Sequence, residues 1–135
     1  MMSFPTAIKT CLSKFAEFSG RAPRAEYWWF LLFMVLVILA VDVIVAIAVD
    51  DSDDVIKVIN WVIQIGFLLP SIAVSVRRLH DCDASGWHYL WMFVPFLGVI
   101  GLLIWFCFRG TPGDNRFGPD PLAPAVGNDV AEVFR

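Results

Sequence analysis

The sequence has 135 residues, enough for one domain, and its hydrophobic residues (59 %) far outnumber its charged residues (17 %). Soluble domains are about 45–50 % apolar and about 25 % charged, and a small soluble domain buries too little surface to hide this excess. The composition therefore excludes an ordinary soluble domain, and a net charge of −3 argues against a nucleic-acid partner, which needs a basic surface.

The first predicted element is an amphipathic helix over residues 3–18. An aromatic face opposite a basic face is typical of a helix that lies in the headgroup region of a bilayer. Packing of the same face against the protein's own helices is the alternative. Gly20 and Pro23 then end the helix. The residues that share the apolar face are Phe4, Ile8, Cys11, Leu12, Phe15 and Phe18.

Three long apolar segments follow, at residues 27–49, 55–76 and 87–108. Each reaches the roughly 20 residues that a helix needs to cross a bilayer. We therefore predict an all-α membrane protein, with an amphipathic interfacial N-terminal helix and three transmembrane helices in a single domain over residues 1–121. For the third segment a re-entrant hairpin that turns between Pro95 and Gly98 is the alternative. The stretch after Gly110 predicts tight turns, and residues 122–135 a poorly ordered tail.

Basic residues are distributed unevenly between the predicted spans. Four precede the first span, none lies in the acidic loop of residues 50–54, and Arg77 and Arg78 begin the second loop. The positive-inside rule then places the N-terminus and the second loop in the cytoplasm. With three spans, the C-terminal tail would lie outside, in the periplasm or extracellular space.

Asp42 is the one charged residue within the first apolar segment. A carboxylate at that depth costs about 2.5–3.5 kcal/mol on insertion scales unless it has a partner. If the first two spans form an antiparallel hairpin, Asn60 and Gln64 lie on one helical face at the depth of Asp42. We interpret these residues as polar contacts between helices, with an ion or proton path as the alternative.

The same hairpin places Glu26 level with Arg78 at its cytoplasmic end. An ion pair of Glu26 with Arg77 or Arg78 would hold this end closed; separate solvation of the three side chains is the alternative. The candidate polar cluster comprises Arg21, Arg24, Glu26, Arg77, Arg78, His80 and Asp81.

The second loop contains His80, Asp81 and Cys82, whose side chains are of the kinds that bind metals or act as nucleophiles. A metal site needs about four ligands in a defined geometry, and a nucleophilic pair needs a third group that orients the base. Adjacent residues in one short loop provide neither arrangement. We therefore expect no metal, no cofactor and no catalytic residue.

Three stretches within residues 15–121 resemble the signatures of one known family. They are residues 18–29 (FSGRAPRAEYWW), residues 70–87 with PS, RRLHD and SGW, and residues 95–121 with Pro95 and GDNRFGPDP. This pattern is similar to that of the bacterial inner-membrane family called domain of unknown function 805, the YhaH-like proteins. The resemblance implies a small protein of the bacterial inner membrane, and it implies no activity.

We expect a non-enzymatic, multi-pass protein that acts through contacts with membrane lipids, with other membrane proteins or with copies of itself. The alternative is a small transporter or channel with Asp42 lining the path. Because three spans enclose no pore by themselves, such a channel would need several copies of the chain.

Overall fold

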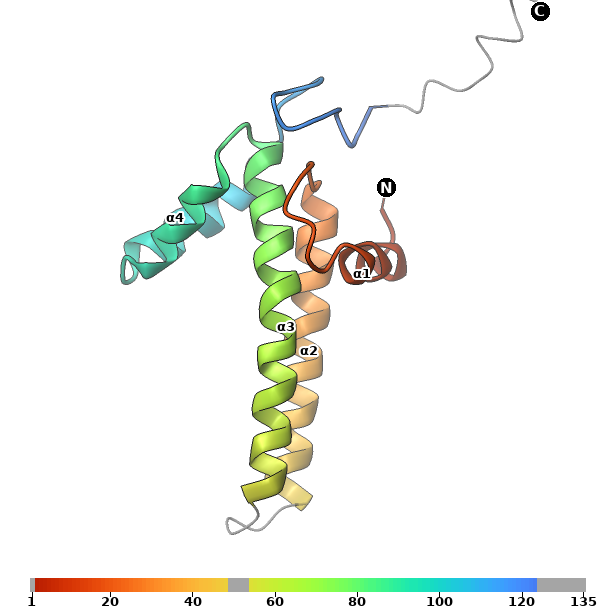
Figure 1. The fold of residues 1–135 in the computed structure, drawn as a ribbon, viewed down its shortest axis with the longest axis vertical. Helices are drawn as coiled ribbons and strands as arrows, with labels where there is room; N and C mark the ends of the chain where they lie inside the picture. The colour runs from red at the N-terminus through yellow and green to blue at the C-terminus, as the bar shows by residue number, and fades with distance from the viewer. Residues whose placement is uncertain (1, 49–53, 124–135) are drawn as a thin grey trace, which may run out of the picture.

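A computed structural model of the protein describes residues 2–48 and 54–123 (Figure 1). The regular elements in these residues are helices joined by turns and loops, apart from an isolated bridge between Asn115 and Gly118. The acidic first loop and most of the predicted poorly ordered tail lie outside the described residues. The helices are α1 (Phe4–Ser13), α2 (Arg24–Ala48), α3 (Asp54–Asp81), the 3₁₀ helix η1 (Gly86–Phe93) and α4 (Leu97–Cys107).

α2 and α3 form a long antiparallel pair, the axis of the molecule in Figure 1. α2 contains neither Gly nor Pro, and α3 continues through Pro70, where the Ser71 hydroxyl donates to the Phe67 carbonyl at 2.6 Å. Across the pair, the rings of Phe33 and Phe67 meet edge to face at 6.1 Å. Both helices are long and apolar enough to cross a membrane.

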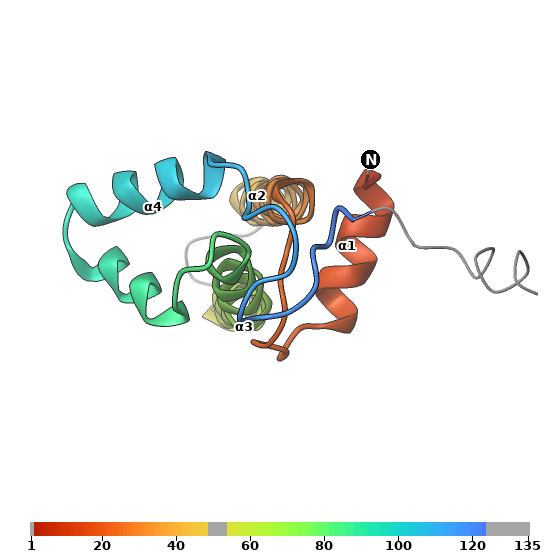
Figure 2. The same cartoon turned by 90° about the horizontal axis from the view of Figure 1, so that it is seen from above.

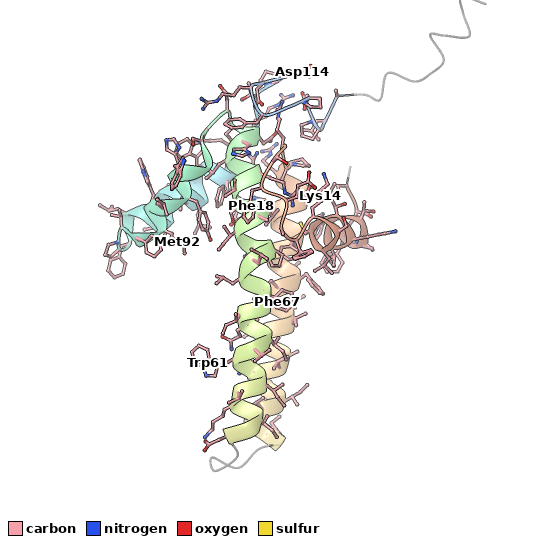
Figure 3. All side chains as sticks on the ribbon, in the orientation of Figure 1. Lys14, Phe18, Trp61, Phe67, Met92 and Asp114 are labelled. Atoms are coloured by element: carbon pink, nitrogen blue, oxygen red, sulfur yellow. The ribbon has the colours of Figure 1, made fainter. Side chains whose placement is uncertain are left out.

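The apolar side chains of this pair point mostly outward. In the most apolar part of α2, where the mean hydropathy is 3.2, only 6 % is buried. Trp61 is 66 % exposed and projects away from the helices in Figure 3. Burial is concentrated instead where α2 begins and α3 ends, around Phe30, Val74 and Leu79. The pair therefore presents a large apolar surface that the described chain does not cover.

α1 lies across α2 near this same end (Figures 1 and 2). It packs through Ala7 and Cys11, both fully buried, whereas Phe15 remains 53 % exposed. The helix ends at Ser13, so the predicted helix over residues 3–18 is too long. The Ala22 N–H donates to the Arg77 carbonyl at 3.0 Å, and the chain leaves the helix early to reach that contact at the end of α3.

The third apolar segment is not one continuous helix. η1 and α4 form a hairpin on the side of the α2–α3 pair opposite α1 (Figure 2). Pro95 and Phe96 make the turn, and Phe96 adopts a left-handed backbone conformation with φ +59°. A Cβ on Gly98 would lie 1.7 Å from the Trp91 carbonyl oxygen, so glycine permits the two arms to approach closely. The predicted 22-residue helix over residues 87–108 is thus replaced by the hairpin that was its alternative.

The hairpin returns the chain to the end of the molecule where α2 begins. The Thr111 N–H donates to the Asp81 carbonyl at 2.8 Å, and Asn115 and Gly118 close a tight turn above α3. The described part of the tail therefore lies at the same end as the segment before α2. Which side of a membrane each segment faces stays a prediction.

Candidate functional site

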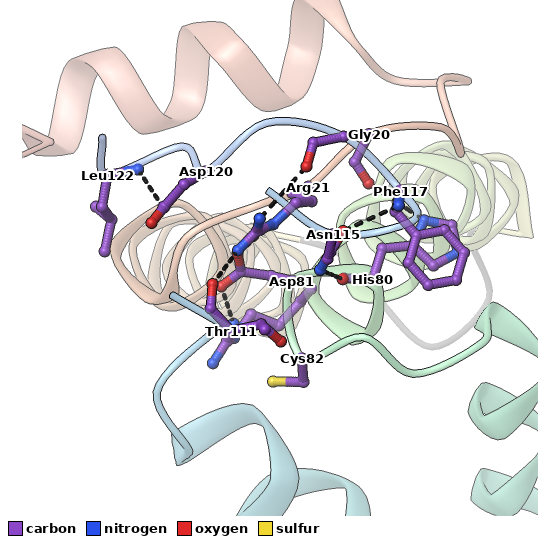
Figure 4. A network of polar contacts seen from close by, with 12 residues as sticks. Gly20, Arg21, His80, Asp81, Cys82, Thr111, Asn115, Phe117, Asp120 and Leu122 are labelled. Atoms are coloured by element: carbon purple, nitrogen blue, oxygen red, sulfur yellow. Dashed lines mark hydrogen bonds and ion pairs between the residues drawn. The ribbon is translucent and has the colours of Figure 1, made fainter. Parts of the chain in front are cut away.

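A buried cluster of charged residues lies where α2 begins, α3 ends and the tail crosses over them (Figure 4). The C-terminal end of α3 contributes Arg77, Arg78 and Asp81, and the segment before α2 contributes Arg21. Arg77 and Arg78 are the largest fully buried side chains in the described chain, at 1 % and 0 % exposure. Buried charges require partners, because an unpaired ion loses its hydration without compensation.

Asp81 is the centre of the cluster, with one guanidinium on each carboxylate oxygen. Arg21 Nε donates to Oδ1 at 3.0 Å and Arg78 Nη1 donates to Oδ2 at 2.5 Å. Arg21 also donates from Nη1 to the Gly113 carbonyl and from Nη2 to the Thr111 carbonyl, both at 2.6 Å. The contacts of Arg21 therefore join three distant parts of the chain.

Arg78 connects the same carboxylate to the end of α4. Its Nε donates to the Phe106 carbonyl at 3.2 Å, and its Nη2 donates to the Phe108 carbonyl. These are carbonyls of the last turn of α4, which lack partners inside the helix. A guanidinium at a helix C-terminus also interacts favourably with the helix dipole. Arg78 thus fixes the hairpin to α3.

Gly110 is placed against Asp81 so closely that no side chain fits. A Cβ at this position would lie 2.1 Å from Asp81 Oδ2, the oxygen that accepts from Arg78. The glycine therefore belongs to the cluster, although it contributes no charge.

Glu26 and Arg77 form a second buried ion pair, with Arg77 Nη1 at 2.5 Å from Glu26 Oε1. The sequence left open whether Arg77 or Arg78 would be the partner, and the structure selects Arg77. Cys11 of α1 lies 3.6 Å from the same carboxylate oxygen. Burial, and next the negative charge of Glu26, raise the pKa of the Cys11 thiol to about 12. Sequence reasoning assigned Cys11 only to the apolar face of α1.

The remaining guanidinium nitrogens of Arg77, Nε and Nη2, are buried without a hydrogen-bond partner in the described part of the chain. Buried polar atoms of this kind are generally satisfied by ordered water.

His80 lies at the edge of the cluster. Its Nδ1 is 3.2 Å from the Gly20 carbonyl oxygen, and its ring stacks on Phe117 with the centroids 3.9 Å apart. The Asn115 side chain donates to the His80 carbonyl at 2.9 Å. Sequence reasoning did not single out Asn115 or Phe117, although both lie in the GDNRFGPDP stretch that carries the family resemblance.

Arg24 is the member of the predicted cluster that stays outside it. The side chain is exposed, and in the described chain it donates to the Cys107 carbonyl at 3.3 Å rather than to a carboxylate. The other six predicted residues come together: Arg21, Glu26, Arg77, Arg78, His80 and Asp81.

The polar residues predicted to lie within the membrane are found further along the α2–α3 pair. Asn60 donates to Asp42 Oδ1 at 2.9 Å, and Gln64 donates to the Asn60 side-chain oxygen at 3.4 Å. Gln64 therefore supports Asp42 through Asn60.

The cluster holds three segments of the chain together by charge. Each carboxylate accepts from at least one guanidinium. Most other guanidinium N–H groups donate to backbone carbonyls at the end of α4 or in the tail. Burial raises the pKa of the Cys82 thiol as well, which leaves it largely protonated at neutral pH. Within residues 2–48 and 54–123, no group of three or more His, Cys, Asp or Glu side chains could hold a metal ion.

The chain is similar to a known protein family over most of its length. The family model described as "Protein of unknown function (DUF805)" matches residues 15–119. The inner membrane protein YhaI of Escherichia coli K12 is 41 % identical over 110 residues, covering 82 % of this chain and 90 % of YhaI. The inner membrane protein YhaH of the same strain is 37 % identical over 121 residues, covering 82 % and 91 %.

No solved structure matches the chain. The family match includes every residue of the buried charge cluster, from Arg21 before α2 to Gly118 in the tail. The chain therefore belongs to the DUF805 family.

Proposed function

We propose that this chain is an integral protein of the bacterial inner membrane that acts without catalysis, through contacts with lipids or with other membrane proteins. α2 and α3 cross the bilayer, and the η1–α4 hairpin enters the cytoplasmic leaflet and returns. Both described ends of the chain lie on the cytoplasmic side.

The exposed apolar surface of α2 is the observation that carries this proposal. A helix with a mean hydropathy of 3.2 and 6 % burial differs from the core helix of a soluble protein, which is mostly buried. Lipid is the solvent in which such a surface is stable. The inner-membrane relatives YhaI and YhaH support the same location.

The distribution of charge supports the orientation. Lys9, Lys14 and Arg24 lie near the beginning of α2, and the buried arginines lie at the adjoining end of α3. Basic residues are retained on the cytoplasmic side of short segments. Because the hairpin returns the tail to this end, the tail contacts Arg21 without crossing the membrane a third time.

The contacts of the cluster support a non-enzymatic role. Asp81 and Glu26 already accept from guanidinium groups, and His80 is covered on one face by Phe117. These side chains hold segments of the chain together, which is a structural role.

Reporter fusions test the topology in whole cells. Alkaline phosphatase, which is active only outside the cytoplasm, is fused after Asp51, after Ala84 or after Arg135. We expect activity after Asp51 and none after Ala84 or Arg135. Activity after Arg135 would show that the third apolar segment crosses the membrane, and would overturn the two-span arrangement.

Complementation tests the non-enzymatic role. In a strain whose phenotype depends on this protein, the double variant His80→Gln, Cys82→Ser should complement as well as the unchanged chain. Loss of complementation by a variant that inserts and melts normally would favour an enzyme that uses these side chains.

A further inference from the structure

Arg24 is chemically distinct from the three buried arginines at its end of the molecule. Arg21, Arg77 and Arg78 are buried and each pairs with a carboxylate. Arg24 is exposed, and in the described chain its guanidinium is held by the neutral Cys107 carbonyl. Its positive charge is therefore available to an anion from outside the protein.

A groove of about 520 Å³ opens beside this guanidinium. Arg24, Ala25, Trp28 and Trp29 line it from α2, and Cys107 lines it from the end of α4. The Trp29 ring is supported by an edge-to-face contact with Phe4 of α1, with centroids 5.5 Å apart. The groove thus combines one cation, two indoles and a wall from a second helix.

The order of these groups along α2 matches the order of groups in a phospholipid. Arg24 is the first residue of α2, and Trp28 lies about 6 Å deeper at a rise of about 1.5 Å per residue. Indoles prefer the headgroup level, where one side of the ring is apolar and the other is wet. A phosphate at Arg24 would place the glycerol and the first acyl carbons over the indoles.

We propose that this groove binds one anionic phospholipid of the cytoplasmic leaflet, with its phosphate on the Arg24 guanidinium and its acyl chain against Trp28 and Trp29. The exposed Arg109, two residues after Cys107, adds positive charge nearby and favours an anionic over a zwitterionic headgroup. This inference rests on the proposed function, because it requires α2 to begin at the cytoplasmic headgroups.

Native mass spectrometry of the full-length protein in neutral detergent tests the site. The protein is titrated with phosphatidylglycerol or phosphatidylcholine, and the first bound lipid is quantified for the unchanged chain, Arg24→Gln and Arg116→Gln. Arg116 is the matched control, since it is also an exposed cation but pairs with Asp83 at 3.2 Å and does not line the groove.

We expect Arg24→Gln to weaken binding of the first phosphatidylglycerol by about fivefold, the equivalent of one basic residue at an anionic surface. Arg116→Gln should change it less than twofold. Phosphatidylcholine, whose choline cation offsets the charge of its phosphate, should bind the unchanged chain more weakly and respond less to Arg24→Gln. Equal effects of the two substitutions would overturn the proposal, because net charge rather than the groove would then set the affinity.

Three further measurements distinguish this site from other sources of lipid binding. Arg24→Lys retains the charge and should retain most of the preference for phosphatidylglycerol, whereas Trp28→Ala should weaken binding of both lipids. Inorganic phosphate at millimolar concentration should not compete; full competition would identify a site for soluble phosphate compounds and would contradict the proposal. A lipid preference that survives Arg24→Gln, together with the expected fusion results, would reject this site and leave the proposed function intact.

Discussion

A single residue without a side chain, Gly110, decides whether the charge cluster of this protein can form. Gly110 leaves room for the Asp81 carboxylate, and Asp81 neutralises Arg21 and Arg78. Breaking a buried ion pair by removing or displacing one partner typically costs about 3–5 kcal/mol, because the other charge stays buried.

Gly110→Ala is therefore expected to destabilise the protein by about 3 kcal/mol, since the new Cβ would displace Asp81 from its guanidinium partners. Thermal unfolding of the purified protein in mild detergent measures this effect. Gly66→Ala is the matched control, because nothing lies within 4 Å of a Cβ at that position in α3. Equal melting temperatures for the two variants would show that the close approach at Gly110 is unimportant.

Asp42 gives a second prediction at this scale. Asp42→Asn should be tolerated, since an amide still accepts from Asn60 and no longer carries a charge into the apolar region. Asp42→Leu should lower the melting temperature, because the Asn60 side chain then loses its partner between the helices. If Asp42 carried ions or protons, Asp42→Asn would abolish the phenotype and leave the melting temperature unchanged.

At the scale of elements, the hairpin shows how a long apolar segment becomes two short helices. Pro95 lacks the N–H that a continuous helix would use, and Phe96 at φ +59° reverses the chain. The rings of Trp91 and Trp105 then meet across the hairpin, with centroids 6.2 Å apart. The arms are held together by this packing, and Arg78 joins the end of α4 to α3.

Gly98→Ala is expected to open the hairpin, because a Cβ there would overlap the backbone of Trp91 at 1.7 Å. Overpacking of this kind costs about 1–3 kcal/mol, which thermal unfolding in detergent detects. Gly101→Ala on the same helix meets its nearest neighbour at 4.0 Å and should melt no lower than the unchanged protein. Equal behaviour of the two alanine variants would argue for a continuous third helix.

At the scale of the whole molecule, the interactions are unevenly distributed along the long axis. α1, the hairpin and the tail all gather around one end of the α2–α3 pair, and the pair extends alone toward the other end (Figure 1). Ion pairs and hydrogen bonds of charged groups join the parts at the crowded end. The tail up to residue 123 is consequently part of the fold, although this described part contains no helix.

Truncation measures how much the tail's contacts stabilise the protein. A chain ending at Phe108 loses the Thr111 and Gly113 carbonyls that accept from Arg21, at about 1.5–3 kcal/mol for each hydrogen bond to a charged group. It should melt well below the full chain. A chain ending at Ala123 keeps these contacts and should melt like the full chain. If the shorter chain melted at the same temperature as the full chain, the tail's contacts would not stabilise the fold.

The sequence alone determined the features that depend on local pattern. The two long helices followed from uninterrupted apolar runs, because a segment of that length and composition can satisfy its backbone only as a helix. The Glu26–Arg77 pair followed nearly as directly, since an antiparallel hairpin fixes which residues lie at equal depth. The Asp42–Asn60 contact was predicted by the same argument.

The tertiary structure decided how the chain folds after α3, as a hairpin of two short helices. Pro95 was compatible with both a kinked span and a turn, so the local pattern left the choice open. The hairpin is held by contacts between residues far apart in the chain, where Arg78 binds the carbonyls that end α4 and Arg21 binds the tail. Periodicity reports which face of one helix is apolar, but it carries no information about which distant carbonyl a buried guanidinium will reach.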